Sequence, residues 1–171
     1  MKVALFGAGT MGRGIAQVFA AKGHTVLMYA SSPASAQRHK DTLGKSLAKR
    51  VEKGKMAQEA MDALMANVLI PQTHEEAADA DLVVEAAIEN LDIKKSIFAE
   101  LDSICKPETI LASNTSSISI TAIAAATKRP DKFIGMHFFN PATVMKLVEV
   151  IRGTHTSDET YKTIAELAAA I

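Results

Sequence analysis

The chain has 171 residues, of which 48% are apolar and 22% charged, and its 19 basic residues balance 19 acidic ones. This composition is typical of one folded domain and excludes a disordered, collagenous or disulfide-rich chain, while the zero net charge argues against nucleic acid or a membrane as the main partner. Cys105 is the single cysteine and no zinc-binding motif occurs, so we expect no disulfide, no metal and a cytoplasmic location.

Short apolar runs alternate with longer segments of helical periodicity, which is the pattern of βα units around a mostly parallel sheet. The first run leads into a glycine-rich loop, and the apolar residues after it recur at helical spacing as far as Gly23. Two helical segments separated by Gly54 then form a long excursion. The first half of the chain is predicted to hold strands at 2–6, 25–29, 67–70 and 82–86, and helices at 11–23, 34–53 and 57–66.

The second half repeats this pattern and then departs from it. Two β-like segments flank the turn-rich residues 140–143, which are predicted to reverse the chain. The sequence therefore predicts an α/β fold of Rossmann type: a doubly wound, mostly parallel sheet with a helical excursion after the second strand and a terminal antiparallel hairpin. Strands are expected at 109–112, 132–138 and 145–151, and helices at 93–104, after Ser117, and from Ser157 to Ile171.

The motif Gly7-x-Gly9-x-x-Gly12 lies between the first strand and the first helix. Glycines permit a tight turn and a close approach of backbone N–H groups to a pyrophosphate, whose charge the helix N-terminus attracts. In this βαβ context the motif indicates a dinucleotide site that also includes Thr10 and Met11, the alternative being a glycine-rich turn without a ligand.

The same fingerprint expects an acidic residue at the end of the second strand, where it holds the adenosine ribose 2′-hydroxyl. Here Tyr29 is followed by Ala30, Ser31 and Ser32, with no acid. Without a carboxylate nothing repels a 2′-phosphate, which Ser31, Ser32 and Arg38 could bind. Alternatively, hydroxyl and backbone groups alone hold the ribose. Both NAD and NADP are therefore open as cofactors.

His137 and Glu149 lie twelve residues apart, one in each of the last two predicted strands. In a hairpin centred at residue 143 they are directly opposite, so their side chains can meet on one face. A carboxylate beside an imidazole stabilises the imidazolium and leaves the second ring nitrogen free to accept a substrate proton. The alternative is a histidine that merely packs in the core beside a solvated glutamate.

Polar residues also follow the fifth and sixth predicted strands. Ser113-Asn114-Thr115-Ser116-Ser117 is a cluster of hydroxyl and amide groups, and Asn140 follows His137 at the end of the sixth strand. Ligands of open α/β sheets bind at these carboxyl ends of strands, so the two segments are candidate site residues. For the serine cluster the alternative is a helix N-cap made by Ser116 or Ser117.

Four motifs taken in this order resemble the 3-hydroxyacyl-CoA dehydrogenases, and the resemblance covers the whole chain. It implies that residues 1–171 are the dinucleotide-binding domain, and that the helical C-terminal domain of the family, which provides most of a homodimer interface, lies outside this chain. The uncapped end of the last helix likewise leads us to expect a longer natural polypeptide. The motifs are GAGTMG at 7–12, VEAAIEN at 84–90, ASNTSS at 112–117 and GMHFFNP at 135–141.

The resemblance further implies an enzyme that interconverts (S)-3-hydroxyacyl-CoA and 3-ketoacyl-CoA by hydride transfer with NAD or NADP. Acyl-CoA is the implied partner, with 3-hydroxybutyryl-CoA and acetoacetyl-CoA as the expected pair. The family's usual acid after the second strand is replaced by Ala30. The matched positions are His137 as base, Glu149 as its orienting partner, Ser116 and Asn140 beside the substrate and cofactor, Glu89 and Lys94 at the cofactor, and Ser46 and Lys53 at coenzyme A.

Two other functions remain open from the sequence. One is a dinucleotide-dependent dehydrogenase of another small hydroxy acid, for which the basic residues around Ser46 are only a solvated helix face. The other is a nucleotide-binding protein without catalytic activity. The basic residues in question are Arg38, Lys40, Lys45, Lys49, Arg50, Lys53 and Lys55.

Overall fold

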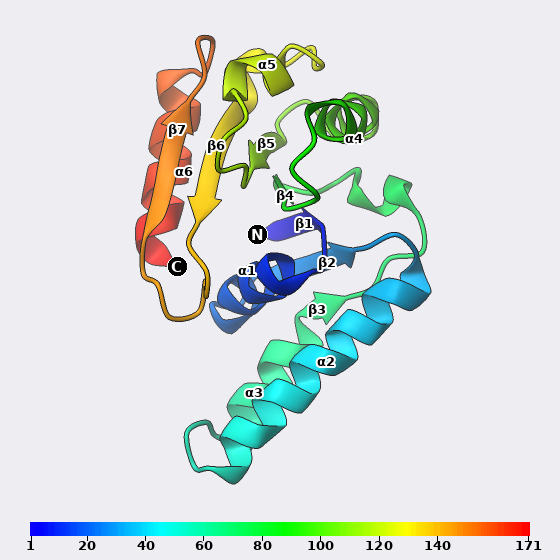
Figure 1. Cartoon of the computed structure of the whole chain (residues 1–171), viewed down its shortest axis with the longest axis vertical. Coiled ribbons are helices and arrows are strands. Elements are labelled where there is room, and N and C mark those ends of the chain that lie inside the picture. Colours follow the sequence, from blue (N-terminus) through cyan, green and yellow to red (C-terminus); the bar gives the residue numbers. More distant parts are fainter.

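Seven strands form a single sheet in the order β3-β2-β1-β4-β5-β6-β7 (Figure 1). In the computed structural model, which describes residues 1–171, β1 to β6 run parallel and β7 runs antiparallel to β6. This confirms the predicted doubly wound sheet and its terminal hairpin. The strands are β1 Lys2–Phe6, β2 Thr25–Tyr29, β3 Val68–Leu69, β4 Leu82–Glu85, β5 Ile110–Ser113, β6 Phe133–Phe138 and β7 Val148–Arg152.

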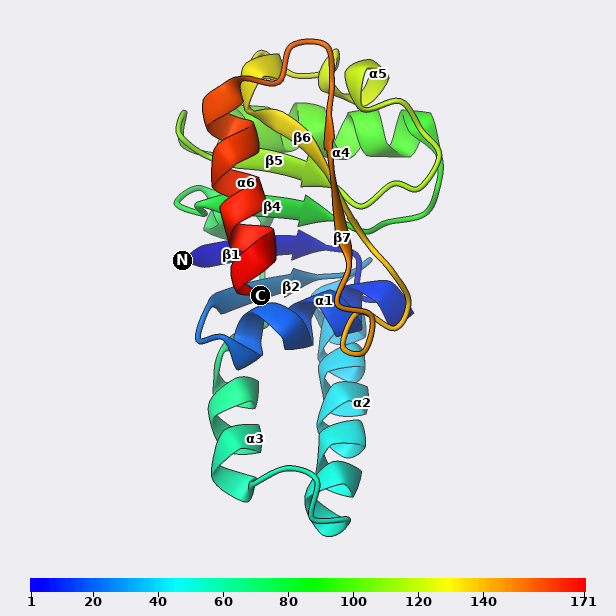
Figure 2. The same ribbon diagram turned by 90° about the vertical axis from the view of Figure 1, so that its left-hand side faces the viewer.

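Helices cover both faces of the sheet (Figure 2). In the central strand β1, Val3 and Leu5 pack into the core beneath α1 and α6, whereas Ala4 and Phe6 pack into the core beneath α4 and α5. A strand buried on both faces has to be apolar throughout, which explains the unbroken run at its sequence position. The helices are α1 Thr10–Ala21, α2 Pro33–Glu52, α3 Gln58–Ala66, α4 Leu91–Ile104, α5 Ile120–Ala124 and α6 Asp158–Ala170.

The helical excursion after β2 is a hairpin of α2 and α3 that extends away from the sheet (Figures 1 and 2). The helix α2 begins after Ser32, whose hydroxyl oxygen accepts a hydrogen bond from the backbone N of Ser35 (3.1 Å). Leu43, Leu47 and Leu64 bury their side chains in the core beside α1. These three leucines anchor the base of the hairpin, while its far end stands clear of the sheet.

Two predicted strand boundaries were wrong for identifiable reasons. The third strand is shorter than predicted because Asn67 closes α3, its backbone N donating to the carbonyl of Leu64 and its side chain to that of Ala20. The strand β7 begins at Val148, three residues later than predicted, because Met145 is exposed and lies outside the β6–β7 ladder. The short helix is capped by Ser119 rather than by Ser116 or Ser117. No helix is long and apolar enough to cross a membrane.

Candidate active site

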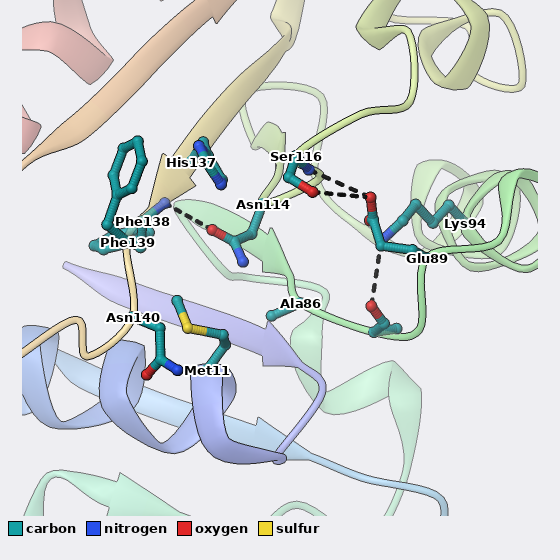
Figure 3. Close-up of a pocket in the computed structure, with 11 residues that line it drawn as sticks. Met11, Ala86, Glu89, Lys94, Asn114, Ser116, His137, Phe138, Phe139 and Asn140 are labelled. Atoms are coloured by element: carbon teal, nitrogen blue, oxygen red, sulfur yellow. Dashed lines mark hydrogen bonds and ion pairs between the residues drawn. The ribbon is translucent and has the colours of Figure 1, made fainter.

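The carboxyl ends of β1, β4, β5 and β6 meet at one edge of the sheet, and a cavity of about 290 Å³ opens there (Figure 3). Side chains from the ends of three strands and from α1 and α4 converge on it. Among the candidate residues from the sequence, six lie together in this one cavity. It is lined by Met11, Ala86, Ala87, Glu89, Lys94, Asn114, Ser116, His137, Phe138, Phe139 and Asn140.

His137 and Glu149 are directly opposed in the β6–β7 ladder, as the predicted hairpin requires. The Nδ1 atom of His137 lies 3.8 Å from a carboxylate oxygen of Glu149, which is an ion-pair distance and too long for a hydrogen bond. The imidazole is 17% exposed and the carboxylate 50% exposed. Because Nδ1 is directed to Glu149, Nε2 is the ring nitrogen left for a ligand in the cavity.

Asn114 fixes the position of β6 at the site, although its role could not be assigned from the sequence. Its side-chain oxygen accepts a hydrogen bond from the backbone N of Phe138 (2.7 Å), the residue after His137. This bond joins the end of β5 to the end of β6. The NH₂ group of Asn114 makes no hydrogen bond within the protein and can donate to a ligand in the cavity.

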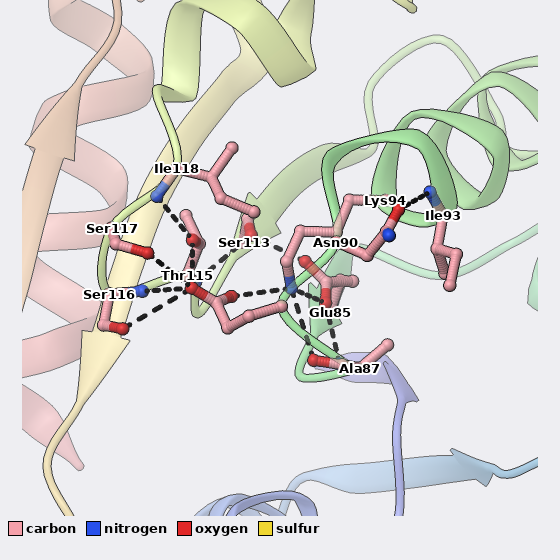
Figure 4. A network of polar contacts seen from close by, with 11 residues as sticks. Glu85, Ala87, Asn90, Ile93, Lys94, Ser113, Thr115, Ser116, Ser117 and Ile118 are labelled. Carbon is pink, nitrogen blue, oxygen red and sulfur yellow. Dashed lines mark hydrogen bonds and ion pairs between the residues drawn. The ribbon is translucent and has the colours of Figure 1, made fainter.

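A buried ion-pair network lies beneath the cavity (Figure 4). Lys94 and Glu85, which are 1% and 0% exposed, are joined by a 2.5 Å contact. The remaining acceptor capacity of Glu85 is filled by the hydroxyl of Ser113 (2.6 Å) and the backbone N of Ala87 (2.7 Å). Lys94 also contacts Glu89 (3.1 Å) at the cavity wall. Sequence reasoning missed Glu85, even though an acid ending an apolar strand is a sign of a buried partner.

Glu89 organises the serine cluster that was predicted as part of the site, with a helix cap as the alternative. One of its carboxylate oxygens accepts hydrogen bonds from the hydroxyls of Thr115 (2.9 Å) and Ser117 (3.2 Å) and from the backbone N of Ser116 (3.3 Å). Burial by itself raises the pKa of Glu89, but the hydrogen bonds from Lys94, Thr115 and Ser117 and the charge of Lys94 outweigh it and lower this pKa. The cluster is thus held by a carboxylate that stays ionised.

We expect this arrangement to lose stability in acid. Because the folded-state pKa of Glu89 lies below its ordinary value of 4.5, its contribution is fully present above pH 4.5 and is lost as the pH falls through the lower, folded-state pKa. The difference in free energy of unfolding between the wild type and Glu89→Gln should therefore shrink below pH 4.5, as measured by urea denaturation. A Glu59→Gln control, at an exposed carboxylate, should show no such trend; a pH-independent difference for Glu89→Gln would contradict the prediction.

The glycine loop combines two crowded positions with one open position. Gly7 has a φ of +116°, and a Cβ on Gly12 would lie 1.8 Å from the Gly7 carbonyl oxygen. A Cβ on Gly9 would instead meet nothing within 4 Å. Gly7 and Gly9 border a second cavity of about 560 Å³ that extends to Ala30 and Ser31 at the end of β2. An open backbone at a helix N-terminus, facing a long cavity, fits the pyrophosphate and adenosine of a dinucleotide.

Two alanine substitutions should separate folding from binding in this loop. Gly9→Ala should change the free energy of unfolding by less than about 1 kcal/mol, since the new methyl group enters open space, yet weaken dinucleotide binding by blocking the backbone. Gly12→Ala should destabilise the chain by about 2 kcal/mol or more because its methyl group meets a backbone carbonyl. Urea denaturation and NADH fluorescence titration measure the two effects. Equal binding by Gly9→Ala and the wild type would remove the loop from the site.

Ser46 and Lys53, which the resemblance places at coenzyme A, differ in whether they border a cavity. Ser46 on α2 lines a cavity of about 230 Å³ together with Thr10 and Asn140, and Asn140 also lines the 290 Å³ cavity. The two cavities therefore adjoin at Asn140. Lys53, predicted as the last residue of the helix, is instead the C-cap residue after Glu52, is exposed, and lines no described cavity.

His39 and His74 each contact a charged side chain from a distant segment. The Nη1 atom of Arg13 lies 2.8 Å from Nδ1 of His39, and Nδ1 of His74 lies 2.7 Å from a carboxylate oxygen of Glu100. The partners lie 26 residues away in sequence in each case, on α1 and α4, so local spacing gave no signal. Both His39 and His74 line the 560 Å³ cavity.

Comparisons with known proteins agree with this geometry. Residues 2–171 match the family described as the NAD-binding domain of 3-hydroxyacyl-CoA dehydrogenase. The chain is 48% identical over 171 residues to a 3-hydroxybutyryl-CoA dehydrogenase of Clostridioides difficile, covering 100% of this chain and 61% of that protein. It is 50% identical over 166 residues to a 3-hydroxyadipyl-CoA dehydrogenase of Escherichia coli, covering 96% and 35%.

A solved structure gives the same result. The crystal structure of an (S)-3-hydroxybutyryl-CoA dehydrogenase from Ralstonia eutropha matches with a TM-score of 0.94 and 44% identity, covering 99% of this chain and 60% of that one. The chain thus spans 61% of the length of the Clostridioides difficile relative and 60% of the Ralstonia eutropha chain. On its sequence, fold and site, the chain belongs to the 3-hydroxyacyl-CoA dehydrogenase family.

Proposed function

We propose that this chain is the cofactor-binding and catalytic part of an enzyme that interconverts (S)-3-hydroxyacyl-CoA and 3-ketoacyl-CoA, with 3-hydroxybutyryl-CoA and acetoacetyl-CoA as the preferred pair. The observation that carries the proposal is the position of His137. Its imidazole borders the cavity at the strand ends, beside Glu149 and a short way along the sheet edge from the glycine loop. The names of the relatives supply the acyl-CoA class.

The loop of Gly7, Gly9 and Gly12 would hold the pyrophosphate, and Met11, Glu89 and Lys94 would border the nicotinamide end. When bound, the dinucleotide supplies the acceptor for a hydride that leaves C3 with the electron pair of the C–H bond. His137 accepts the proton of the 3-hydroxyl on Nε2, so that the hydroxyl oxygen forms the new carbonyl. In the reverse direction the imidazolium returns this proton to the oxygen.

The other groups of the site position the substrate. Glu149 stabilises the positive charge that His137 gains, and its 3.8 Å separation from Nδ1 can shorten when the ring becomes charged. Ser116 and Asn140 line the same cavity as His137 and have hydrogen-bonding groups suited to the thioester or the 3-oxygen. Phe138 and Phe139 supply apolar walls that reduce the water around the reacting carbon.

Coenzyme A would leave the cavity past Asn140 toward α2. Ser46 lines the adjoining cavity, and the basic residues of α2, with Lys53 just beyond its end, offer positive charge to the phosphates. Homodimerisation through a helical segment outside this chain is part of the same proposal.

Because the basic residues of α2 would bind the phosphates of coenzyme A, a shortened thioester substrate that lacks the nucleotide of coenzyme A should react with a higher KM than acetoacetyl-CoA.

The direct test is a spectrophotometric assay of acetoacetyl-CoA reduction with NADH and NADPH, in this chain and, where the natural polypeptide is longer, in that polypeptide. We expect oxidation of at least one reduced nicotinamide that depends on acetoacetyl-CoA. Dinucleotide binding without turnover would instead indicate a non-catalytic nucleotide-binding protein. Turnover of small free hydroxy acids with no preference for the CoA thioester would indicate the other dehydrogenase class.

A further inference from the structure

The adenosine end of the 560 Å³ cavity carries no carboxylate. It is bounded there by Ala30, Ser31, Ser35 and His39, and none of the residues lining the whole cavity is Asp or Glu. A smaller cavity of about 70 Å³ shares Ala30 and Ser31 with it and is also free of acids. In the dinucleotide fingerprint an acid at this position bonds the ribose 2′-hydroxyl and disfavours a 2′-phosphate. Both effects are absent when the residue is alanine.

The same wall offers hydrogen-bond donors and a positive charge. Ser31 is exposed, and no protein group bonds its hydroxyl, whereas the hydroxyl oxygen of Ser32 accepts the capping bond of α2. Arg13 lies 2.8 Å from Nδ1 of His39. Because a guanidinium can only donate, this ring nitrogen must accept, which leaves the proton of the neutral imidazole on Nε2 as a further donor. The guanidinium charge thus lies directly behind the ring that borders the cavity.

Acidic residues on the elements that pack here are turned to other partners. Glu100 of α4 bonds His74, a ring that lines both cavities, and Glu76 accepts hydrogen bonds from the backbone N atoms of Gln72 and Thr73. Neither Glu100 nor Glu76 lines the 560 Å³ or the 70 Å³ cavity. A volume of 70 Å³ at this point holds several water molecules, which leaves space for a phosphate group.

We propose that the adenosine-ribose end of this cavity accepts a 2′-phosphate, so that NADP(H) binds at least as tightly as NAD(H), and that Ala30 is the residue that determines this specificity. The inference rests on the proposed function, because it places a dinucleotide in the 560 Å³ cavity. It concerns only the ribose end, which lies at the end of β2, whereas the proposed chemistry lies at His137 on β6.

The test compares the dissociation constants of NADPH and NADH by fluorescence titration in the wild type, Ala30→Asp and Ser31→Ala. We expect the wild type to bind NADPH no more weakly than NADH. Ala30→Asp should raise the dissociation constant of NADPH by at least about tenfold, because the new carboxylate faces the 2′-phosphate. The dissociation constant of NADH should stay unchanged or fall. Ser31→Ala should raise the dissociation constant of NADPH about threefold to tenfold, with little change in that of NADH.

The matched control is Ala34→Asp, which places the same charge on an exposed position of α2 that lines neither cavity. It should alter the ratio of the two dissociation constants by less than about threefold. Tighter binding of NADH than of NADPH by the wild type would overturn the inference and leave the proposed function intact, as would an unchanged ratio in Ala30→Asp. Failure to bind either dinucleotide would contradict the proposed function itself.

Discussion

Replacing His137 by Gln should lower kcat for acetoacetyl-CoA reduction by 10²–10⁴-fold, which corresponds to about 3–5 kcal/mol in the activation barrier. Gln keeps a polar side chain of similar size but cannot exchange a proton with the 3-oxygen. The imidazole borders the cavity beside the Phe139 ring, to which it is tilted by 57° at a centroid separation of 4.6 Å, and its Nδ1 is directed toward Glu149. Removing it therefore removes the single imidazole that lines the cavity.

The His137→Gln measurement needs binding and folding controls. NADH affinity and the urea midpoint should stay close to their wild-type values, since the ring is a cavity-lining group that makes no hydrogen bond in the free protein. His155→Gln, at an exposed histidine of the loop after β7, should leave kcat unchanged. A His137→Gln enzyme with near-normal kcat would remove this residue from the mechanism.

Breaking the buried pair of Glu85 and Lys94 should have the largest effect on stability. Lys94→Met leaves the Glu85 carboxyl group buried with only hydroxyl and backbone donors, and Glu85→Gln leaves Lys94 with a single carboxylate at the cavity wall. Removing one partner of a buried ion pair typically costs about 3–5 kcal/mol because the other charge loses its compensation. We therefore expect each single variant to lose about that much in free energy of unfolding.

A double-mutant cycle distinguishes this pairing from simple loss of packing. The variant carrying both Glu85→Gln and Lys94→Met should lose less free energy of unfolding than the two single variants lose together, since no uncompensated charge remains. Lys95→Met is the matched control on the same helix, because Lys95 has no ion-pair partner, and it should change stability by less than about 0.5 kcal/mol. Additive losses in the cycle would show that the two charges do not depend on each other.

The sheet and its hairpin could be predicted from the sequence because their signals are local. Strands buried on both faces are continuous apolar runs, and the glycine loop fixes the first βα turn. The register of His137 with Glu149 followed from the centre of one turn. The start of β7 could not be found in this way, because Met145 and Leu147 are apolar yet exposed, so composition alone extended the predicted strand toward the turn.

The parts of the site that sequence reasoning missed depend on contacts between distant segments. Glu89 holds Ser116 and Ser117 from 27 and 28 residues away, so the serine segment predicted as a candidate site has Ser116 at the cavity, while the carboxylate that organises it gave no local signal. The burial of Glu85 depends on Lys94 across the β4–α4 loop. Several serines in the segment could have capped α5, and the tertiary bonds to Glu89 leave that role to Ser119.

The most direct measurement is a crystal structure of the protein with a reduced nicotinamide and acetoacetyl-CoA. We predict that Nε2 of His137 lies within about 3.2 Å of the 3-oxygen, with C4 of the nicotinamide next to C3 in the 290 Å³ cavity. A nicotinamide ring bound away from the ends of β4 to β6, or a 3-oxygen bonded by another acid while His137 faces elsewhere, would contradict the assignment of this cavity as the catalytic centre.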